Sequence, residues 1–370
     1  MASTTEATVE RDPLRPRRAW RPSQQTVTAL VSSLVFFGLV MVVALAPVPY
    51  VSRAPGRTVD LAGATQNGEP VVRVQGLQTH RLNGELRMTT VSVTSVDARL
   101  GLLQALASHQ LSYRDVLPRK AVYDPLQTEE EVKATEVRAM SDSKSFAVIA
   151  ALRAAGHPVK ELPQVAAVTI SGPSFELLEP GDLIQKVDGT AVQTIRDVEE
   201  AVRAHKVGSP VVFTVERGGR ATSVTVTAKG TPTNPRHPDV GVEWGVGYQY
   251  SPQVDFGIDP AIVGPSAGLV FSLAVYDMVT PDDLLQGRKV AGTGAISPVG
   301  TVYPIGGIQE KVRGAEKAGA TVFLVPSGNC RDVRGVKTSM ELVKVETLRD
   351  AITGLQKLKT SKDGAGVPRC

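Results

Sequence analysis

The chain has 370 residues, of which 42% are hydrophobic and 21% charged. Since domains usually hold about 100 to 200 residues, this length and composition allow more than one packed core. The formal net charge of +4 includes a cluster of arginines near the start: Arg11, Arg15, Arg17, Arg18 and Arg21. The rest of the chain is therefore nearly neutral, which argues against a nucleic-acid partner.

Residues 27–46 form an uncharged apolar run, VTALVSSLVFFGLVMVVALA. About 20 residues at about 1.5 Å each span a hydrocarbon core of about 30 Å, so the run predicts a transmembrane helix over residues 26–47. A cleaved signal peptide is the alternative, because Ala44-Leu45-Ala46 resembles a cleavage triplet. The apolar run is longer than the usual core of about 7 to 15 residues, and Pro47 follows it directly, so we expect the helix to be retained.

The arginine cluster precedes this run, and Arg53 and Arg57 are the nearest cations after it. Because positive charge favours the cytoplasmic side, we expect residues 1–25 to be a disordered cytoplasmic tail. The protein would then cross the cell membrane once, with everything after Tyr50 outside the cytoplasm.

The two cysteines are Cys330 and Cys370. A disulfide is permitted outside the cytoplasm, and it would tie the tail, residues 356–370, to the preceding domain. Two free thiols are equally consistent with the sequence.

Residues 71–74 and 86–93 carry β-branched residues on either side of the turn signal Asn83-Gly84, so we expect these segments to pair as a hairpin. Residues 129–155 are charged and then alanine-rich, with apolar side chains at helical spacing. Gly156 and Pro158 end that pattern, which predicts a long helix.

A mostly β module follows, with a strand candidate at 165–170, the segment LLEPGDLIQKVDGTAV, a helix candidate at 195–204, and the strands VVFTVE and TSVTVTAK. Residues 231–239 begin with TPTNPRHP, which is rich in proline and polar residues and is typical of a linker. Alternating strands and helices from 240 to about 355 predict a second module.

The motif Gly-Pro-Ser-Ala-Gly, with its serine at Ser266, precedes the apolar run LVFSLAVYDMV. We expect Ser266 in the first turn of a helix, where free N–H groups and the helix dipole can stabilise an oxyanion. Small residues on either side let a substrate backbone approach closely. Serine is also common at helix starts for structural reasons alone, so this motif by itself does not define a nucleophile.

A second motif, PIGGIQEK, ends in Lys311. At about 100° per residue, Lys311 falls at the margin of an apolar stripe, whereas Glu310, Arg313 and Lys317 should point the other way. Burial would lower the pKa of Lys311 from about 10.4 toward about 7 to 8, where a lysine acts as a base. The alternative is a side chain that extends to solvent along its stem.

Together with VAGTGAIS at residues 290–297, these motifs resemble in order and spacing the catalytic domain of the Lon protease family. The resemblance implies an α+β proteolytic domain with a serine–lysine dyad, in which Ser266 is the nucleophile, Lys311 the general base and Thr293 a hydrogen-bond partner of the lysine. LRMTTVSV resembles the strand that opens this domain in membrane-anchored relatives, so residues 55–155 and 240–355 would both belong to it. Lon-like relatives form rings, which implies a homo-oligomer.

Residues 156–230 resemble a PDZ domain of bacterial proteases, chiefly through LLEPGDLIQKVDGTAV. A PDZ domain inserted in the proteolytic domain could capture protein or peptide substrates by strand addition. The preceding stretch PVKELPQVAAV has no clear glycine-rich loop for a terminal carboxylate, so a structural spacer is the alternative.

No G-x-x-x-x-G-K-[ST], H-E-x-x-H or C-x-x-C motif occurs, so we expect no ATP-driven unfolding, no metal and no other cofactor. The five histidines stand in no recognisable catalytic context. We therefore expect an ATP-independent, membrane-anchored serine endopeptidase that cleaves unfolded or membrane-proximal segments outside the cytoplasm. The alternative from another class is a catalytically silent membrane-tethered PDZ adaptor.

Overall fold

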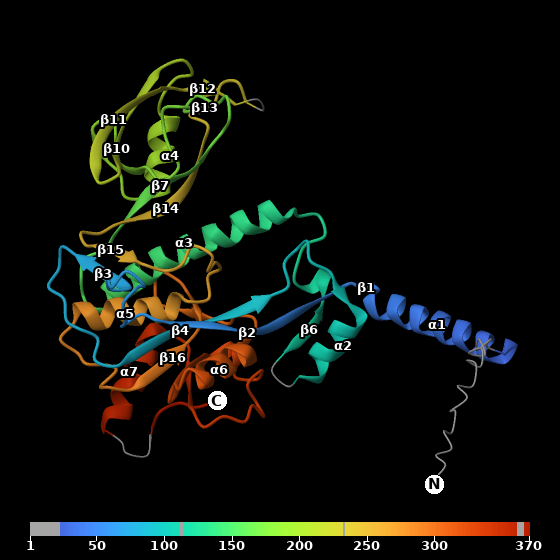
Figure 1. The fold of residues 1–370 in the computed structure, drawn as a ribbon. Coiled ribbons are helices and arrows are strands. Elements are labelled where there is room, and N and C mark those ends of the chain that lie inside the picture. Colours follow the sequence, from blue (N-terminus) through green and yellow to red (C-terminus); the bar gives the residue numbers. More distant parts are fainter. Residues whose placement is uncertain (1–22, 112–113, 232–233, 361–365) are drawn as a thin grey trace, which may run out of the picture.

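The computed structural model describes residues 23–111, 114–231, 234–360 and 366–370. Two bodies and one projecting helix, α1, make up this part of the chain (Figure 1). We call the body that contains the long helix α3 the larger module and the β-rich body above it in Figure 1 the smaller module.

The larger module is built on a six-stranded sheet with the order β20-β19-β16-β4-β2-β6. Its strands are β2 (Tyr50–Asp60), β4 (Glu85–Val93), β6 (Asp115–Pro118), β16 (Lys289–Gly292), β19 (Val322–Pro326) and β20 (Glu341–Val345). β4 runs parallel to β16 and antiparallel to β2. The sheet therefore joins strands from before and after the smaller module, although the exact domain boundaries stay a prediction.

Apolar side chains fill both faces of this sheet, because successive residues of a strand point to opposite sides. Val290 and Leu324 lie in a core with helices α3 (Glu129–Ala154), α5 (Gly268–Val279) and α7 (Leu348–Thr360). Ala291 and Phe323 lie in a second core with α6 (Ile308–Lys317). The helix predicted at 129–155 is confirmed as α3, whose N-terminus has a capping box made by Thr128 and Glu131.

The hairpin predicted around Asn83-Gly84 is wrong. The strand β3 (Val72–Gln75) pairs with β15 (Gln253–Phe256), and β4 pairs with β2 and β16 instead. Gly84 has a positive φ of 139°, and a Cβ there would lie 2.6 Å from the Arg288 carbonyl oxygen. The conformation of this turn is therefore determined by its packing against Arg288, which is distant in sequence. The Asn83-Gly84 signal did not determine which strands pair with β3 and β4.

The smaller module has a sheet of order β11-β10-β8-β7-β14, with β9 (Thr190–Ala191) beside β8. The strands are β7 (Lys160–Val168), β8 (Leu183–Val187), β10 (Pro210–Arg217), β11 (Arg220–Thr227) and β14 (Val242–Gln249). Helix α4 (Ile195–Arg203) contributes Val198 and Val202 to the core of this module. Asp188 and Gly189 form the turn between β8 and β9, since Val187 pairs with Thr190.

Strand β14 lies after residue 240, where we expected the second module to start, and it belongs to the sheet of the smaller module. It pairs with β7 over eight residues, and Trp244 packs on Phe213 with ring centroids 6.1 Å apart. The expected linker at 231–239 follows β12 (Lys229–Gly230) and ends in β13 (Pro238–Asp239), and these two short strands pair with each other. Gly247 leaves room for Leu183, with which a Cβ at this position would collide. The chain thus returns to the smaller module before it enters β15.

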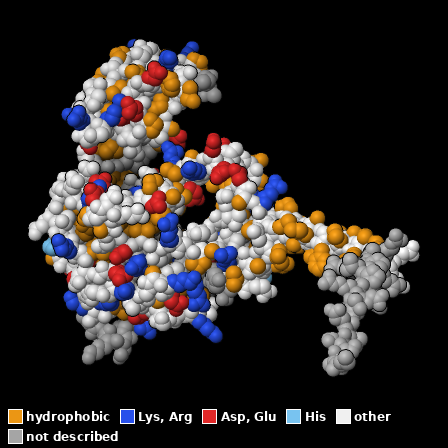
Figure 2. All heavy atoms as spheres, viewed as in Figure 1, with side chains coloured by type: hydrophobic (Ala, Val, Ile, Leu, Met, Phe, Trp, Pro, Cys, Tyr) orange, Lys and Arg blue, Asp and Glu red, His pale blue; other side chains and the backbone are white. Residues whose placement is uncertain are grey.

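Helix α1 (Gln24–Leu45) corresponds to the predicted span. Its length, its mean hydropathy of 2.5 and the absence of buried residues along it fit a membrane-spanning helix, but a signal sequence passes the same test. Figure 2 shows apolar side chains along α1 and at its junction with the larger module. Most of the predicted cytoplasmic tail, with its five arginines, lies outside the described residues.

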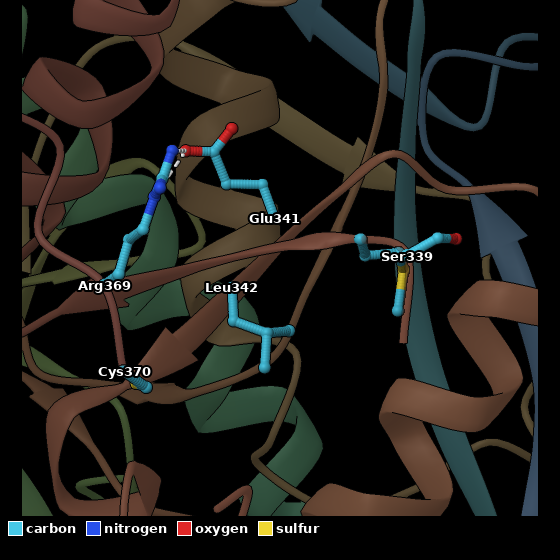
Figure 3. A pocket seen from close by; sticks show the side chains of 6 residues that line it. Ser339, Glu341, Leu342, Arg369 and Cys370 are labelled. Carbon is cyan, nitrogen blue, oxygen red and sulfur yellow. Dashed lines mark hydrogen bonds and ion pairs between the residues drawn. The ribbon is translucent and has the colours of Figure 1, made fainter. Parts of the chain in front are cut away.

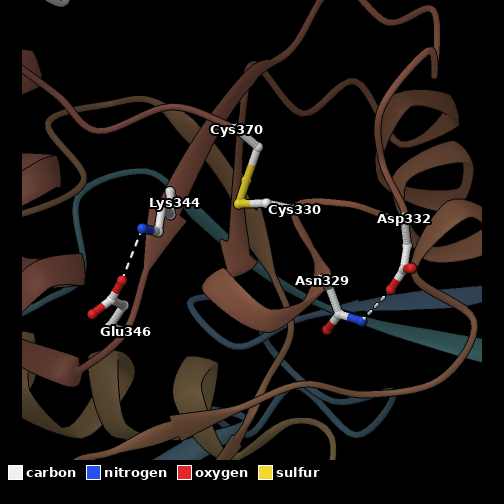
Figure 4. The surroundings of a disulfide bond; sticks show 6 residues. All are labelled: Asn329, Cys330, Asp332, Lys344, Glu346 and Cys370. Atoms are coloured by element: carbon white, nitrogen blue, oxygen red, sulfur yellow. Dashed lines mark hydrogen bonds and ion pairs between the residues drawn. A yellow bond between two sulfur atoms is a disulfide. The ribbon is translucent and has the colours of Figure 1, made fainter.

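The C-terminal residues dock on β20. Lys344 N–H donates to the Pro368 carbonyl and Cys370 N–H to that of Leu342, while Arg369 forms an ion pair of 2.7 Å with Glu341 (Figure 3). Cys330 and Cys370 form a disulfide (Figure 4), which confirms the pairing hypothesis over two free thiols.

The disulfide should stabilise the larger module, because it closes a loop with a sequence separation of 40. A double variant, Cys330→Ser with Cys370→Ser, should lose about 2 to 4 kcal/mol of unfolding free energy. Thermal unfolding without reductant measures the difference. An unchanged midpoint would mean that the ion pair and backbone bonds hold the tail unaided.

Candidate active site

Ser266 lies in the turn that leads into α5, outside the helix itself. The helix begins at Gly268 with Ala267 as its N-cap, so the expectation that Ser266 occupies the first turn was wrong by two residues. The turn is tied to the loop after β16, since Gly294 N–H donates to the Ser266 carbonyl at 2.8 Å and Leu269 N–H to that of Gly294. Ser266 is half-exposed at the end of a buried helix.

Lys311 is in the first turn of α6, and the preceding glycines explain how it is held there. Gly307, the N-cap, has a left-handed φ of 71°, and a Cβ at this position would lie 2.8 Å from Val91 of β4. Glycine therefore allows α6 to begin close against the sheet. Lys311 is only 2% exposed, so its side chain points into the protein rather than along the surface.

The structure brings together Ser266, Lys311 and Thr293. Lys311 Nζ lies 2.7 Å from Ser266 Oγ and 3.0 Å from Thr293 Oγ1. The Thr293 hydroxyl donates its proton to the Ser266 carbonyl at 2.9 Å, so its oxygen accepts from Nζ. Because Thr293 is fully buried, this bond fixes the direction of the amine.

The pKa of Lys311 is lowered to about 7, chiefly by burial and also by the positive charge of Arg53, while Glu310 has the opposite effect. The predicted range of about 7 to 8 is therefore confirmed. A large fraction of this amine is neutral near pH 7, which is the state that can accept a proton.

Glu310 does not point to solvent as we expected, because β2 lies against α6 and covers its first turn. Its side chain is 2% exposed, and neither carboxyl oxygen has a hydrogen-bond partner in the described part of the structure. Burial raises the pKa of Glu310 and the Asp115 carboxylate adds to the rise, whereas Arg53 opposes it. Arg53 and Glu310 thus form a second polar layer beside the lysine, which sequence periodicity missed.

A pocket of about 270 Å³ opens over Ser266 and Lys311. Thr90, Val91 and Ser92 of β4 form one wall, and Ala261–Val263 form another. Among the described hydrogen bonds, none is donated by the backbone N–H of Ala267, which directly follows the serine. That amide can therefore bind an oxygen placed in the pocket.

Helix α3 supports the serine turn from behind, which the sequence did not reveal. Ser143 Oγ donates to the Pro265 carbonyl at 2.9 Å, and Gly264 N–H donates to the Glu136 carbonyl at 3.1 Å. Serines within a charged helix are common, so no local signal distinguishes Ser143 from its neighbours in the sequence.

Two family models match the chain. Residues 258–356 match the Lon protease (S16) C-terminal proteolytic domain, and residues 150–228 match the PDZ domain. The chain therefore combines a serine-peptidase domain of the Lon type with a PDZ domain, which confirms the fold class expected from the motifs.

Curated relatives of the catalytic part are Lon proteases. That of Clostridium beijerinckii is 39% identical over 93 residues, or 24% of this chain and 11% of the relative. Lon protease 1 of Sorangium cellulosum is 39% identical over 105 residues, or 26% and 12%. The match thus spans only about an eighth of these relatives' length.

Solved structures resemble the smaller module. The PDZ domain of the SdrC-like protein from Listeria monocytogenes is 22% identical and covers 22% of this chain and 85% of that chain, with a TM-score of 0.21. A solution structure from Geobacillus thermodenitrificans is 27% identical and covers 23% and 95%, also with a TM-score of 0.21. The PDZ assignment rests on the family model.

If neutral Lys311 is the working form, peptidase activity should depend on pH. The value of kcat/KM should rise as pH increases through about 7, where the amine loses its proton, and should fall about tenfold per pH unit below it. A pH–rate profile with a short peptide substrate measures this. A profile that is flat between pH 5 and 9 would contradict the assigned base.

Arg53 provides a sharper version of this test. The variant Arg53→Met removes a positive charge that lowers the pKa of Lys311, so the acidic limb of the profile should move to higher pH. Arg313→Met is the matched control. Arg313 is on α6, the same helix as Lys311, but its guanidinium pairs with Glu316. A limb that moves equally in both variants, or only in the control, would contradict the role of Arg53.

Proposed function

We propose that this protein is an ATP-independent, membrane-anchored serine endopeptidase with Ser266 as nucleophile and Lys311 as general base. The distance of 2.7 Å between Lys311 Nζ and Ser266 Oγ, at a lysine that is 2% exposed, is the observation that carries this proposal. Burying an amine and lowering its pKa costs folding stability, and groups perturbed in this way are typical of functional sites.

In the proposed mechanism, neutral Lys311 accepts the Ser266 proton as Oγ attacks the carbonyl carbon of the substrate. The Thr293 hydroxyl accepts a hydrogen bond from Nζ, so the lone pair of the amine is directed at the serine. The free N–H of Ala267 binds the developing oxyanion. The protonated lysine then gives its proton to the leaving amine, and water releases the acyl group.

The substrates we propose are unfolded or membrane-proximal protein segments outside the cytoplasm. The pocket over Ser266 is small, and the sequence carries no nucleotide-binding motif of the kind that drives unfolding. Substrate chains would therefore have to arrive already extended.

An extracytoplasmic location is supported by three features. The helix α1 is long and apolar enough to span a bilayer, and the arginine cluster precedes it. The disulfide between Cys330 and Cys370 fits an oxidising compartment.

For the PDZ domain we propose a role in engaging protein or peptide substrates. Since β14 occupies the open side of β7, the strands at the two edges of the sheet are β11 and β14. A substrate strand would add at one of these edges. We also propose that the protein assembles as a homo-oligomer, on the strength of its likeness to Lon proteases.

Cleavage of casein without ATP tests the proposed activity. The parent protein in detergent should cleave it, whereas Ser266→Ala and Lys311→Ala should each lose at least about a thousandfold in kcat, because removing one member of such a unit removes the mechanism. Full activity of Ser266→Ala would refute the proposed nucleophile. Inactivity of the parent as well would favour the adaptor hypothesis.

A further inference from the structure

Helix α2 (Leu102–Gln110) turns an apolar face outward. Ala105 and Ser108 are buried against the larger module, whereas Leu103 and Leu106 are 62% and 55% exposed. A surface helix in water normally has the opposite arrangement, with its leucines inward. No element of the described structure packs over the exposed sides of Leu103 and Leu106.

The face is joined directly to α1. Leu102 N–H donates to the Ala46 carbonyl at 3.0 Å, and β1 (Pro47–Val48) pairs with β5 (Leu100–Gly101), which leads into α2. An entirely apolar notch lies between the two helices. Its lining residues are Leu39, Val40, Val43 and Ala44 from α1, and Leu102, Leu103 and Leu106 from α2.

These contacts define the position of α2 along the axis of α1. Leu39 is six residues before the end of α1, or about 9 Å along the helix axis at about 1.5 Å per residue. Because α2 packs beside residues that lie inside the apolar span, its leucines are level with the last turns of that span. Exposed polar groups next to β1 and β5 in the sequence include Arg99 and the phenol of Tyr50. Arginine and tyrosine are typical of the headgroup region.

We propose that α2 lies in the lipid–water interface of the bilayer, with Leu103 and Leu106 among the acyl chains. This inference rests on the retention of α1 as the anchor in the proposed function. The continuity of the apolar surface from α1 to α2 favours lipid over a second protein chain as the occupant.

The position of α2 also bears on the substrate. A hollow of about 470 Å³ between α2 and the strands β2 and β4 is lined by Gln104, Ser108 and Thr94, and it shares Ser92 with the pocket over Ser266. An extended segment that leaves the bilayer beside α2 therefore meets a hollow that borders, at Ser92, the pocket over Ser266. The interfacial helix selects membrane-proximal segments by holding this entrance at the lipid surface.

The depth of α2 can be measured in the full chain reconstituted in phosphatidylcholine nanodiscs. Leu106→Cys, labelled with the environment-sensitive dye NBD, should show blue-shifted emission that is quenched by lipids spin-labelled near the headgroup. Leu126→Cys is the control, because Leu126 is 91% exposed in the loop before α3. Its label should emit as in water. Emission from position 106 like that in water, or shielding that depends on protein concentration and not on the lipid quencher, overturns the proposal.

A second measurement tests the consequence for cleavage. The double variant Leu103→Ser with Leu106→Ser should lose about tenfold or more in cleavage of a peptide tethered to lipid, while cleavage of casein stays unchanged. Leu126→Ser should change neither rate. An equal loss on both substrates, or no loss, overturns the proposal. If the parent cleaves neither substrate, the proposed function fails, and the fluorescence measurement still decides the position of α2.

Discussion

The burial of the Lys311 amine is the constraint on which the rest of the larger module depends. A pKa near 7 in place of 10.5 means that protonating this amine costs about 5 kcal/mol more in the folded protein than in water. The sheet, α6 and the serine turn must therefore stay closely packed around Nζ, because water entering the site would restore the charge. Thr293, with its hydroxyl bonded to both the lysine and the serine turn, links the three segments.

That constraint explains why distant parts of the sequence meet at the site. β4, which precedes the PDZ domain, provides Val91 against Gly307 and a bond from Thr89 Oγ1 to the Gly292 carbonyl. α3 holds the serine turn through Ser143. β2 brings Arg53 close enough to lower the pKa of the lysine. The residues matched to the Lon proteolytic domain thus carry the dyad, while earlier residues hold it in position.

The sequence predicted that Ser266 and Lys311 lie together, and it predicted the two kinds of domain, because both depend on compact motifs with their own local geometry. Gly307 must adopt a left-handed conformation and Lys311 must follow it within one helical turn, so PIGGIQEK contains most of that information. The partners of β3, the burial of Glu310 and the supporting bond from Ser143 could not be predicted. Each depends on which segment packs against it, and hydrophobic periodicity describes only one segment at a time.

Strand β14 determines where the PDZ domain ends in this chain. Its residues follow those matched to the PDZ domain, yet they complete the PDZ sheet and then pass within a few residues into β15 of the larger module. A deletion that removed only residues 156–230 would leave eight residues of β14 without a pairing partner and Trp244 without its core. Removal or transplantation of the PDZ domain would therefore have to include β14 as well.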